Sequence, residues 1–165
     1  EKDYRNSVSV SSDLGGGIVG ELSHELDLCL SLLGQTDLIF CSKSNSELLE
    51  IECEDNLHVL AKSQKCSKIV IDLDFCTFSE RRFLLIRGNE GELFWDITKD
   101  KLVKKDKEGD HVLWQGNNKP ELRLENQIKD IINNSKVYKS LGCSLMEGIS
   151  VLEFMKLITK KCIND

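Results

Sequence analysis

The sequence lacks the features that mark membrane proteins, disulfide scaffolds and nucleic-acid binders. No apolar run approaches the roughly 20 residues that a membrane-spanning helix needs, and no signal peptide is recognisable. The net charge of −6 is opposite to the basic excess that is typical of nucleic-acid binders. The five lysines between residues 99 and 107 are interleaved with acidic residues, which favours a solvated hairpin. We therefore expect neither a membrane nor a nucleic-acid partner.

The seven cysteines are not arranged for metal binding or for disulfide pairing. None belongs to a CxxC pair, their number is odd, and several lie within apolar patterns. This usage predicts free, mostly buried thiols, a cytoplasmic location and no metal site.

The rest of the composition is typical of one soluble globular domain. The chain has 165 residues, 40% of them apolar and 30% charged, which is enough to form a core. It begins at Glu1 without an initiator methionine. We therefore expect residues 1–165 to be a fragment of a longer protein.

The apolar pattern predicts one helix, a long series of strands and then two more helices. Residues 1–14 are interpreted as an initial loop or edge strand. Apolar positions three and four apart predict a helical face over residues 18–33, with Gly34 as its C-cap and Ser23 as a candidate N-cap. Segment 55–63 fits either a short helix or a strand. Strands are predicted over residues 37–44, 48–53, 68–78, 82–87, 92–97, 101–105 and 110–115.

Two helices are predicted near the end of the sequence. Pro120 suits the first turn of one, and Ser144 with Glu147 has the spacing of a capping box at the start of the other. The predicted core stripe of the last helix is Ile149, Leu152, Met155, Leu157 and Ile158.

This order of elements predicts an α+β fold with a largely antiparallel, open-faced β-sheet and helices packed on one face. In segment 68–78 the residues Ile69, Ile71 and Leu73 point one way. The opposite face carries Val70, Cys76 and Phe78. An apolar open face either contacts a second copy, which gives a homo-oligomer, or is covered by another layer of the same chain. The sequence leaves both alternatives open.

The most informative segment runs from Gly15-Gly16-Gly17 through Glu21-Leu-Ser-His24-Glu25-Leu-Asp27 to Gly34. Glycines let the backbone pass close to another chain or to a ligand. A histidine titrates near neutral pH and can take or give a proton. Asp27 lies one helical turn after His24, where it either shares the histidine's face or is a solvated helix residue. His58 and His111 have no acidic partner at helical spacing and are interpreted as structural.

These residues resemble the second domain of the Gfo/Idh/MocA oxidoreductases. Three glycines, a short apolar run, Ser-His-Glu-Leu-Asp and a helix ending in Leu-Leu-Gly form the main similarity. Segments 3–9, 73–82, 86–96 and 144–152 extend it over nearly the whole chain. The first of these, Asp3-Tyr4-Arg5-Asn-Ser-Val-Ser, is similar to a subgroup tied to bacterial surface-sugar pathways.

The resemblance implies that the parent is an NAD(P)-dependent sugar or sugar-nucleotide dehydrogenase with two domains. Residues 1–165 would be its C-terminal α+β domain, which provides the substrate pocket and the dimer contact. The chain contains neither a strand–GxGxxG–helix unit nor a Glu-Lys-Pro motif, so the Rossmann domain is absent. We therefore expect this fragment to bind no NAD or NADP and to be inactive alone.

The resemblance also assigns site residues. His24 is the expected catalytic base, or the acid in the direction of reduction. The substrate-binding candidates are Tyr4, Arg5, Glu21 and Asp27. Many relatives carry an aspartate four residues before the histidine, where this chain has Gly20, and the nearest acid is Glu21. Arg5 suits a carboxylate or a nucleotide phosphate, or is a surface arginine.

Two other interpretations remain open at this point. The chain is either such a substrate domain or a non-catalytic binding or regulatory module that kept the fold, which Gly20 favours. A third interpretation, an unrelated α+β assembly domain, predicts no cleft around His24.

Overall fold

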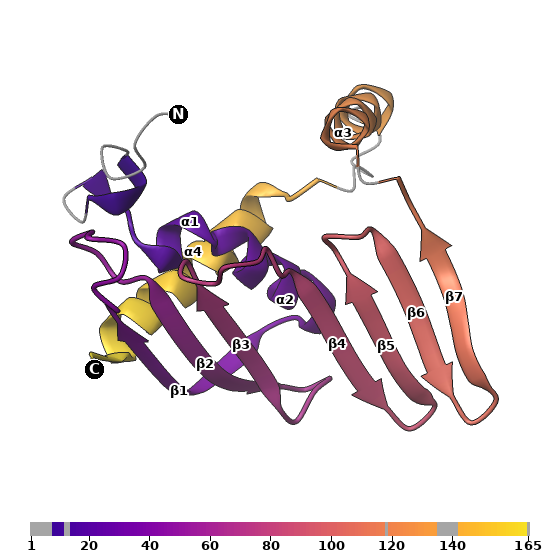
Figure 1. The fold of residues 1–165 in the computed structure, drawn as a ribbon, viewed down its shortest axis with the longest axis horizontal. Coiled ribbons are helices and arrows are strands. Elements are labelled where there is room, and N and C mark those ends of the chain that lie inside the picture. The colour runs from indigo at the N-terminus through magenta and orange to yellow at the C-terminus, as the bar shows by residue number, and fades with distance from the viewer. Residues whose placement is uncertain (1–7, 12–13, 118, 135–141, 165) are drawn as a thin grey trace. The chain divides into compact units, whose positions relative to one another are not determined.

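The elements follow the predicted order of helix, strands and two further helices (Figure 1). The computed structural model describes residues 8–11, 14–117, 119–134 and 142–164. The fold is α+β with open, largely antiparallel β-structure, as the sequence predicted, but the strands form two sheets where one was expected. No Rossmann arrangement occurs among the described residues. The chain divides into two compact units. The first unit comprises residues 1–76 and 143–165, and the second comprises residues 77–142.

The first unit is built on a sheet with strand order β3-β2-β1-β8. Its strands are β1 (Thr36–Ser44), β2 (Asn56–Ser63), β3 (Ile69–Asp74) and the short β8 (Ile163–Asn164). The first three strands are antiparallel to one another, whereas β8 pairs with β1 in parallel. Segment 55–63, which the sequence left undecided, is therefore a strand.

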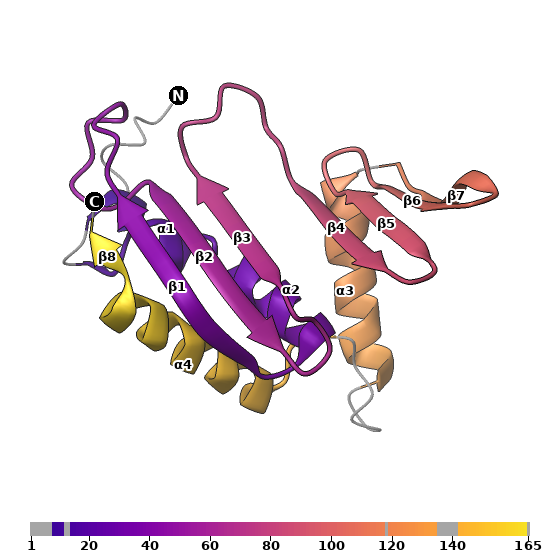
Figure 2. The ribbon, with the colours of Figure 1, turned by 90° about the horizontal axis from the view of Figure 1, so that it is seen from below.

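Three helices cover one face of this sheet (Figures 1 and 2): α1 (Ile18–Glu21), α2 (Ser23–Leu33) and α4 (Leu145–Lys161). Leu26 from α2, Leu57 from β2 and Ile158 from α4 are each fully buried in the core between these layers. Burying a side chain of this size contributes about 1.5–3 kcal/mol to folding. The sequence predicted helices on one face of the sheet, and the first unit confirms it.

The predicted helix over residues 18–33 is in fact two helices that meet at Leu22. The backbone of Leu22 has φ −101° and ψ 23°, outside the helical range, and Glu25 N–H donates to its carbonyl at 2.9 Å. Leu22, and not Ser23, is therefore the N-cap of α2, so the prediction for Ser23 was wrong. Gly34 is the C-cap as predicted, and its φ of 75° suits a glycine.

Helix α4 begins with the predicted capping box. The Ser144 N–H donates to Glu147 Oε2 at 2.7 Å, and the Glu147 N–H donates to Ser144 Oγ at 3.3 Å. The predicted core stripe is mostly wrong, because the buried residues are Val151, Phe154 and Ile158. Ile149 and Leu152 are exposed, and Met155 and Leu157 are half-buried. Apolar residues occur on several sides of this helix, so the sequence is compatible with two different buried stripes.

Residues 48–53 form turns, and the strand predicted there is wrong. Glu47 and Glu50 have positive φ angles of 63° and 54°, which a strand does not accommodate. The loop is held by Asp55, whose side chain is fully buried. Its carboxylate accepts hydrogen bonds from the Ser46 N–H, the Ser46 hydroxyl, the Asn56 amide and the Cys76 thiol.

Strand β3 is shorter than the predicted segment 68–78 and ends at Asp74. Its alternation is as predicted, since Ile69 faces the core and Val70 is exposed on the open face. Cys76 and Phe78 lie beyond the strand, and the Cys76 thiol is directed to Asp55. Of the three residues predicted for the apolar face, only Val70 lies on this strand. Phe40 on β1 and Leu60 on β2 lie in the same cross-strand row as Val70.

The second unit contains a four-stranded antiparallel sheet of order β4-β5-β6-β7. Its strands are β4 (Phe83–Gly88), β5 (Gly91–Asp96), β6 (Lys101–Asp106) and β7 (Gly109–Gln115). Helix α3 (Pro120–Asn134) follows and begins at the predicted proline. Ile97 alone is buried among the described residues of this unit. Across the described parts of both units, no helix has the length and apolarity needed to cross a membrane.

Candidate functional site

The glycine segment passes very close to the chain that precedes it. A Cβ built on Gly16 would lie 2.5 Å from the carbonyl oxygen of Ser9, so only glycine fits there. The Gly16 and Gly17 N–H groups donate to the carbonyls of Ser11 and Ser9, both at 2.9 Å. These amides are therefore used inside the chain, and the segment does not form a cradle for a phosphate.

Gly20 is also fixed by close packing. A Cβ on this residue would lie 2.9 Å from the carbonyl oxygen of Gly15, closer than side chains normally approach backbone oxygen. The path of the glycine segment thus leaves no room for a side chain at residue 20. The resemblance leads us to expect an aspartate at this position. This close packing is a structural reason why residue 20 is glycine and not aspartate.

His24 lies in the first turn of α2, two residues after Leu22, where α1 and α2 meet. Its side chain is 51% exposed, and Nε2 lies 3.2 Å from Glu25 Oε1. The side chain is thus accessible to a substrate and has an acidic neighbour that the sequence places next to it.

The other predicted site residues are only partly gathered around His24. Glu21 ends α1 and is exposed, and no hydrogen bond or ion pair joins it to His24 among the described residues. Asp27 is half-buried on α2, and its Oδ1 lies 3.7 Å from the Cys143 thiol at the start of α4. Tyr4 and Arg5 lie outside the described residues.

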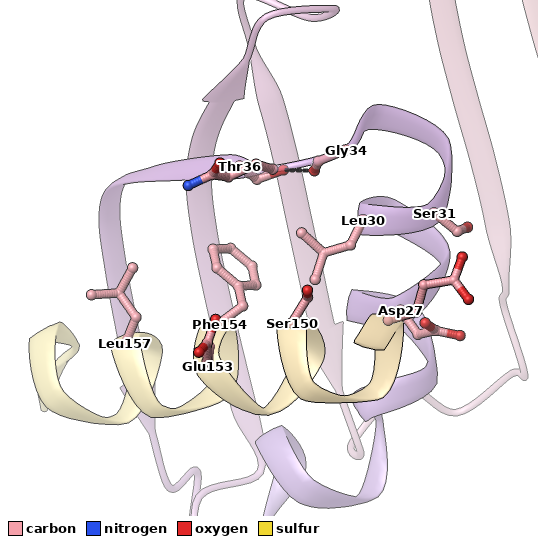
Figure 3. A pocket seen from close by; sticks show the side chains of 11 residues that line it. Asp27, Leu30, Ser31, Gly34, Thr36, Ser150, Glu153, Phe154 and Leu157 are labelled. Atoms are coloured by element: carbon pink, nitrogen blue, oxygen red, sulfur yellow. Dashed lines mark hydrogen bonds between the residues drawn. The ribbon is translucent and has the colours of Figure 1, made fainter. Parts of the chain in front are cut away.

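A cavity of about 580 Å³ opens between α2, α4 and the turn that leads into β1 (Figure 3). Asp27, Leu30 and Ser31 come from α2, and Gly34, Gln35 and Thr36 from the turn. Helix α4 contributes Glu147, Ser150, Glu153, Phe154 and Leu157. Asp27 thus lines this cavity, whereas His24 is not among the residues that line it.

Apart from the Gln35 amide, which carries two N–H donors, the polar side chains of the cavity present hydrogen-bond acceptors, and none of them is basic. Its carboxylates belong to Asp27, Glu147 and Glu153. The hydroxyls of Ser31, Ser150 and Thr36 each donate to a nearby backbone carbonyl, so they offer only lone pairs to a guest. A ligand rich in hydroxyl groups matches this lining better than an anion does.

Two histidines that were interpreted as structural have acidic partners that the sequence analysis missed. His58 Nδ1 lies 2.8 Å from Asp72 Oδ1, because the two residues are directly opposite on β2 and β3. His111 Nε2 lies 3.3 Å from Asp106 Oδ1 across the β6–β7 turn. Strand alternation indicates which face of its strand each histidine occupies. The sequence does not show which strands pair, so it could not identify the acidic partners.

Asp106, His111 and Glu108 also bring three potential metal-ligand atoms within 4.8 Å of one another. Lys104 Nζ occupies the other oxygen of Asp106 at 2.7 Å. Mainly through this hydrogen bond, the pKa of Asp106 is lowered to about 2. The group lies at a largely exposed hairpin end, and nothing else in the described residues marks it as a metal site.

All seven cysteines are free thiols, as the sequence predicted, but the prediction that most of them are buried is wrong. Cys41 and Cys53 are buried, Cys143 is exposed, and the other four are half-buried. Burial raises the pKa of Cys29 to about 11, so this thiol is a poor nucleophile near neutral pH.

Sequence comparison alone places the chain in no group. No protein-family model matches it, and no curated protein sequence matches it.

Several solved structures share its fold. One is a UDP-N-acetylglucosamine 3-dehydrogenase from Acidithiobacillus ferrooxidans (TM-score 0.74, 15% identity, 98% of this chain and 49% of that one). Another is a biliverdin reductase from Synechocystis in complex with biliverdin and NADP+ (TM-score 0.65, 13% identity, 98% and 51%). A third is a 3-ketoreductase from Actinomadura kijaniata in complex with TDP-benzene and NADP (TM-score 0.68, 6% identity, 90% and 48%).

These structural neighbours are oxidoreductases of the Gfo/Idh/MocA type, so the resemblance predicted from the sequence is confirmed for the fold. The chain spans about half the length of the structures it matches. A position as one domain of such a protein is consistent with this coverage.

Proposed function

We propose that this chain is the substrate-binding domain of an NAD(P)-dependent dehydrogenase that acts on a sugar or a sugar nucleotide. The observation that carries the proposal is the fold match over 98% of the chain to a UDP-N-acetylglucosamine 3-dehydrogenase. The 3-ketoreductase with a bound TDP derivative supports the same substrate class. The biliverdin reductase has a similar fold, so the substrate class depends on the site as well as on the fold.

His24 is the proposed catalytic residue. Oxidation of a carbinol requires a base that takes the hydroxyl proton while the hydride leaves the carbon. An accessible imidazole in the first turn of α2 suits this role, and the Glu25 carboxylate, whose Oε1 lies 3.2 Å from His24 Nε2, can orient the ring. Asp27 and the acceptor-rich cavity would hold hydroxyl groups of the substrate. Glu21, Tyr4 and Arg5 remain proposed substrate contacts.

The described residues of this chain do not fit a dinucleotide. The amides of Gly16 and Gly17 are bonded within the chain, and the helix that follows them has only four residues. NAD or NADP, which accepts or supplies the hydride, would therefore be held mainly by the part of the parent that this chain lacks. We expect the chain alone to be inactive.

The free thiols fit a reducing cytoplasmic location. The exposed row of Phe40, Leu60 and Val70 on the first sheet is a candidate contact with a second copy.

The test is turnover of the full-length parent on a panel of sugars and nucleotide sugars, followed by NAD(P)H absorbance. Replacing a general base costs about 10²–10⁴-fold in rate. We therefore expect His24→Ala to lower kcat by at least about 100-fold, while His58→Ala and His111→Ala serve as matched controls with little effect. Turnover that survives His24→Ala unchanged would remove His24 from the mechanism.

One observation favours a second function, a binding module without catalysis. The packing around Gly20 excludes the acid that relatives place before the histidine, and Glu21 makes no contact with His24 among the described residues. Saturable binding of a sugar nucleotide by the parent, with no turnover of any substrate, would support this alternative.

A further inference from the structure

Two cysteines from distant parts of the chain come together in the first unit. Strand β8 follows α4 and lies beside β1 (Figure 2), and the register of this parallel pair places Ser42 opposite Ile163. Cys41 and Cys162 each come one residue before that pair, so the same register brings them opposite each other. The backbone of Cys162 is already extended, with φ −61° and ψ 136°, which lets β8 continue from it.

Both side chains are directed to the core side of the sheet. Cys41 pairs with Val59 of β2, and both residues are only 2% exposed. Cys162 is half-buried and packs against the same hydrophobic cluster. The Cys41 thiol donates to the Ile158 carbonyl at 3.8 Å, and the Cys162 N–H donates to the same oxygen at 2.8 Å. The two cysteines are therefore close neighbours across the end of α4.

The spacing of the two residues suits a disulfide bond. Adjacent strands lie about 4.8 Å apart, and the Cα atoms of bonded cysteines are usually about 4.4–6.8 Å apart. Both thiols are free in the structure. Burial, and next a hydrogen bond with the Cys41 thiol, raise the pKa of Cys162 to about 12. The thiols thus already interact, and a bond between them requires little movement of the backbone.

We propose that Cys41 and Cys162 form a reversible disulfide site that closes when the protein is exposed to a peroxide. Cys162 is the more exposed of the two, so its thiolate attacks one oxygen of hydrogen peroxide, which gives a sulfenic acid and hydroxide. The Cys41 thiol then attacks the sulfenic sulfur, the S–S bond forms and water leaves. In total, two thiols and one peroxide give one disulfide and two water molecules. Two molecules of a small thiol such as glutathione reverse the reaction and become its disulfide.

The surroundings of Cys162 make the first step slow. The thiolate is the reactive form of cysteine, and a thiol with a pKa of about 12 contains little of it near neutral pH. The second step has no such limit, because Cys41 is held next to the sulfenic acid by the strand register. The site therefore responds to sustained oxidation and not to a brief pulse of peroxide.

The bond joins the two chain segments that make up the first unit. Cys41 belongs to the segment 1–76 and Cys162 to the segment 143–165, so the closed loop contains the whole second unit. Closing a long loop restricts the unfolded chain more than closing a short one. We therefore expect the bond to stabilise the first unit by fixing the end of α4 on β1. This inference does not depend on the proposed dehydrogenase function.

A second pair of cysteines fits less well. Cys29 on α2 and Cys66 after β2 are neighbours, because Cys66, after burial, contributes to the raised pKa of Cys29. They belong to a helix and a turn, so no strand register holds them opposite each other. The Cys66 thiol instead donates to the Lys68 carbonyl at 3.1 Å.

The test is the location of the disulfide in the oxidised wild-type chain. The purified chain is incubated with millimolar hydrogen peroxide, free thiols are blocked, and linked peptides are identified by mass spectrometry. We expect one major linkage, between Cys41 and Cys162, which dithiothreitol removes. We also expect the oxidised chain to melt at least about 5 °C above the reduced chain in circular dichroism.

Two variants separate this bond from other effects of oxidation. Cys162→Ser should abolish both the linkage and the shift in melting temperature, whereas Cys66→Ser, which also replaces a half-buried cysteine, should keep both. Linkage of a different pair would overturn the proposal. So would Cys41 and Cys162 that stay reduced while the exposed Cys143 is oxidised, and so would a shift that persists in Cys162→Ser. An oxidised wild-type chain that melts no higher than the reduced one would refute the stabilising role.

Discussion

Asp55 shows at the residue scale how a buried charge is stabilised without a cationic partner. Burial alone favours the neutral acid, but hydrogen bonds from Ser46, Cys76 and Asn56 outweigh it, so the pKa of Asp55 lies below its ordinary value. The residues that donate lie on a loop, on the next strand and beyond β3. No sequence period links them, which explains why the sequence analysis did not find this cluster, although it found His24 beside Glu25.

We expect Asp55→Ala to destabilise the first unit by at least about 2 kcal/mol, because several half-buried donors lose their acceptor at once. Urea denaturation followed by circular dichroism measures this loss. Asp37→Asn, an exposed carboxylate on β1, is the control and should change the unfolding free energy by less than about 0.5 kcal/mol.

The pH dependence follows from the lowered pKa of Asp55. The stabilisation is present above the pKa of an unfolded aspartate, about 3.9, and is lost as pH falls through the lower folded value. The difference between wild type and Asp55→Ala should therefore shrink below about pH 4. A difference that stays constant down to pH 2 would show that the carboxylate charge is not the cause.

At the scale of single elements, two helical glycines should respond to the same substitution with opposite signs. Gly20 in α1 has no room for a Cβ, since Gly15 O would lie at 2.9 Å. Gly148 in α4 has only Cys143 Sγ nearby, at 4.0 Å. We expect Gly20→Ala to destabilise the protein by about 1–3 kcal/mol and Gly148→Ala to stabilise it by about 0.5–1 kcal/mol. Thermal unfolding of both variants measures the two shifts, and equal shifts would refute the packing argument for Gly20.

The helices also show which local signals are reliable. Ser144 with Glu147, Pro120 and Gly34 marked helix ends correctly, because capping depends on neighbouring residues alone. The stripe on α4 was mostly wrong because burial depends on where the sheet lies. Val151 and Phe154 are buried by β1 and its neighbours, and this contact is not encoded in the period of the helix itself.

At the scale of the whole molecule, the strands were largely predictable and their pairing was not. Alternation and turn residues located six of the strands β1 to β7, left β2 undecided between helix and strand, and gave one false strand at residues 48–53. The pairing of β8 with β1 joins residues that are 121 positions apart, Ser42 and Ile163. Strand register also places His58 beside Asp72, so this pair could not be derived from local pattern.

The first unit consists of two chain segments, one before and one after the second unit in the sequence. The later segment contains α4, which supplies part of the core of the first unit. Removing residues 143–165 would take Val151, Phe154 and Ile158 from the core, and losses of this kind cost about 2–5 kcal/mol per side chain. We expect the truncated chain to show no cooperative unfolding transition by calorimetry. Removing residues 162–165 alone keeps α4, and we expect this control to retain the transition.

The same connectivity sets a delay during synthesis. Strands β1 to β3 are synthesised before residues 77–142, and α4 follows only afterwards. At about 5–20 residues per second this interval lasts roughly 3 to 13 s. Throughout it, the apolar side of the first sheet is not yet covered by α4. The nascent chain is therefore a natural client for chaperones, and its yield in cells should depend on the rate of translation through the second unit.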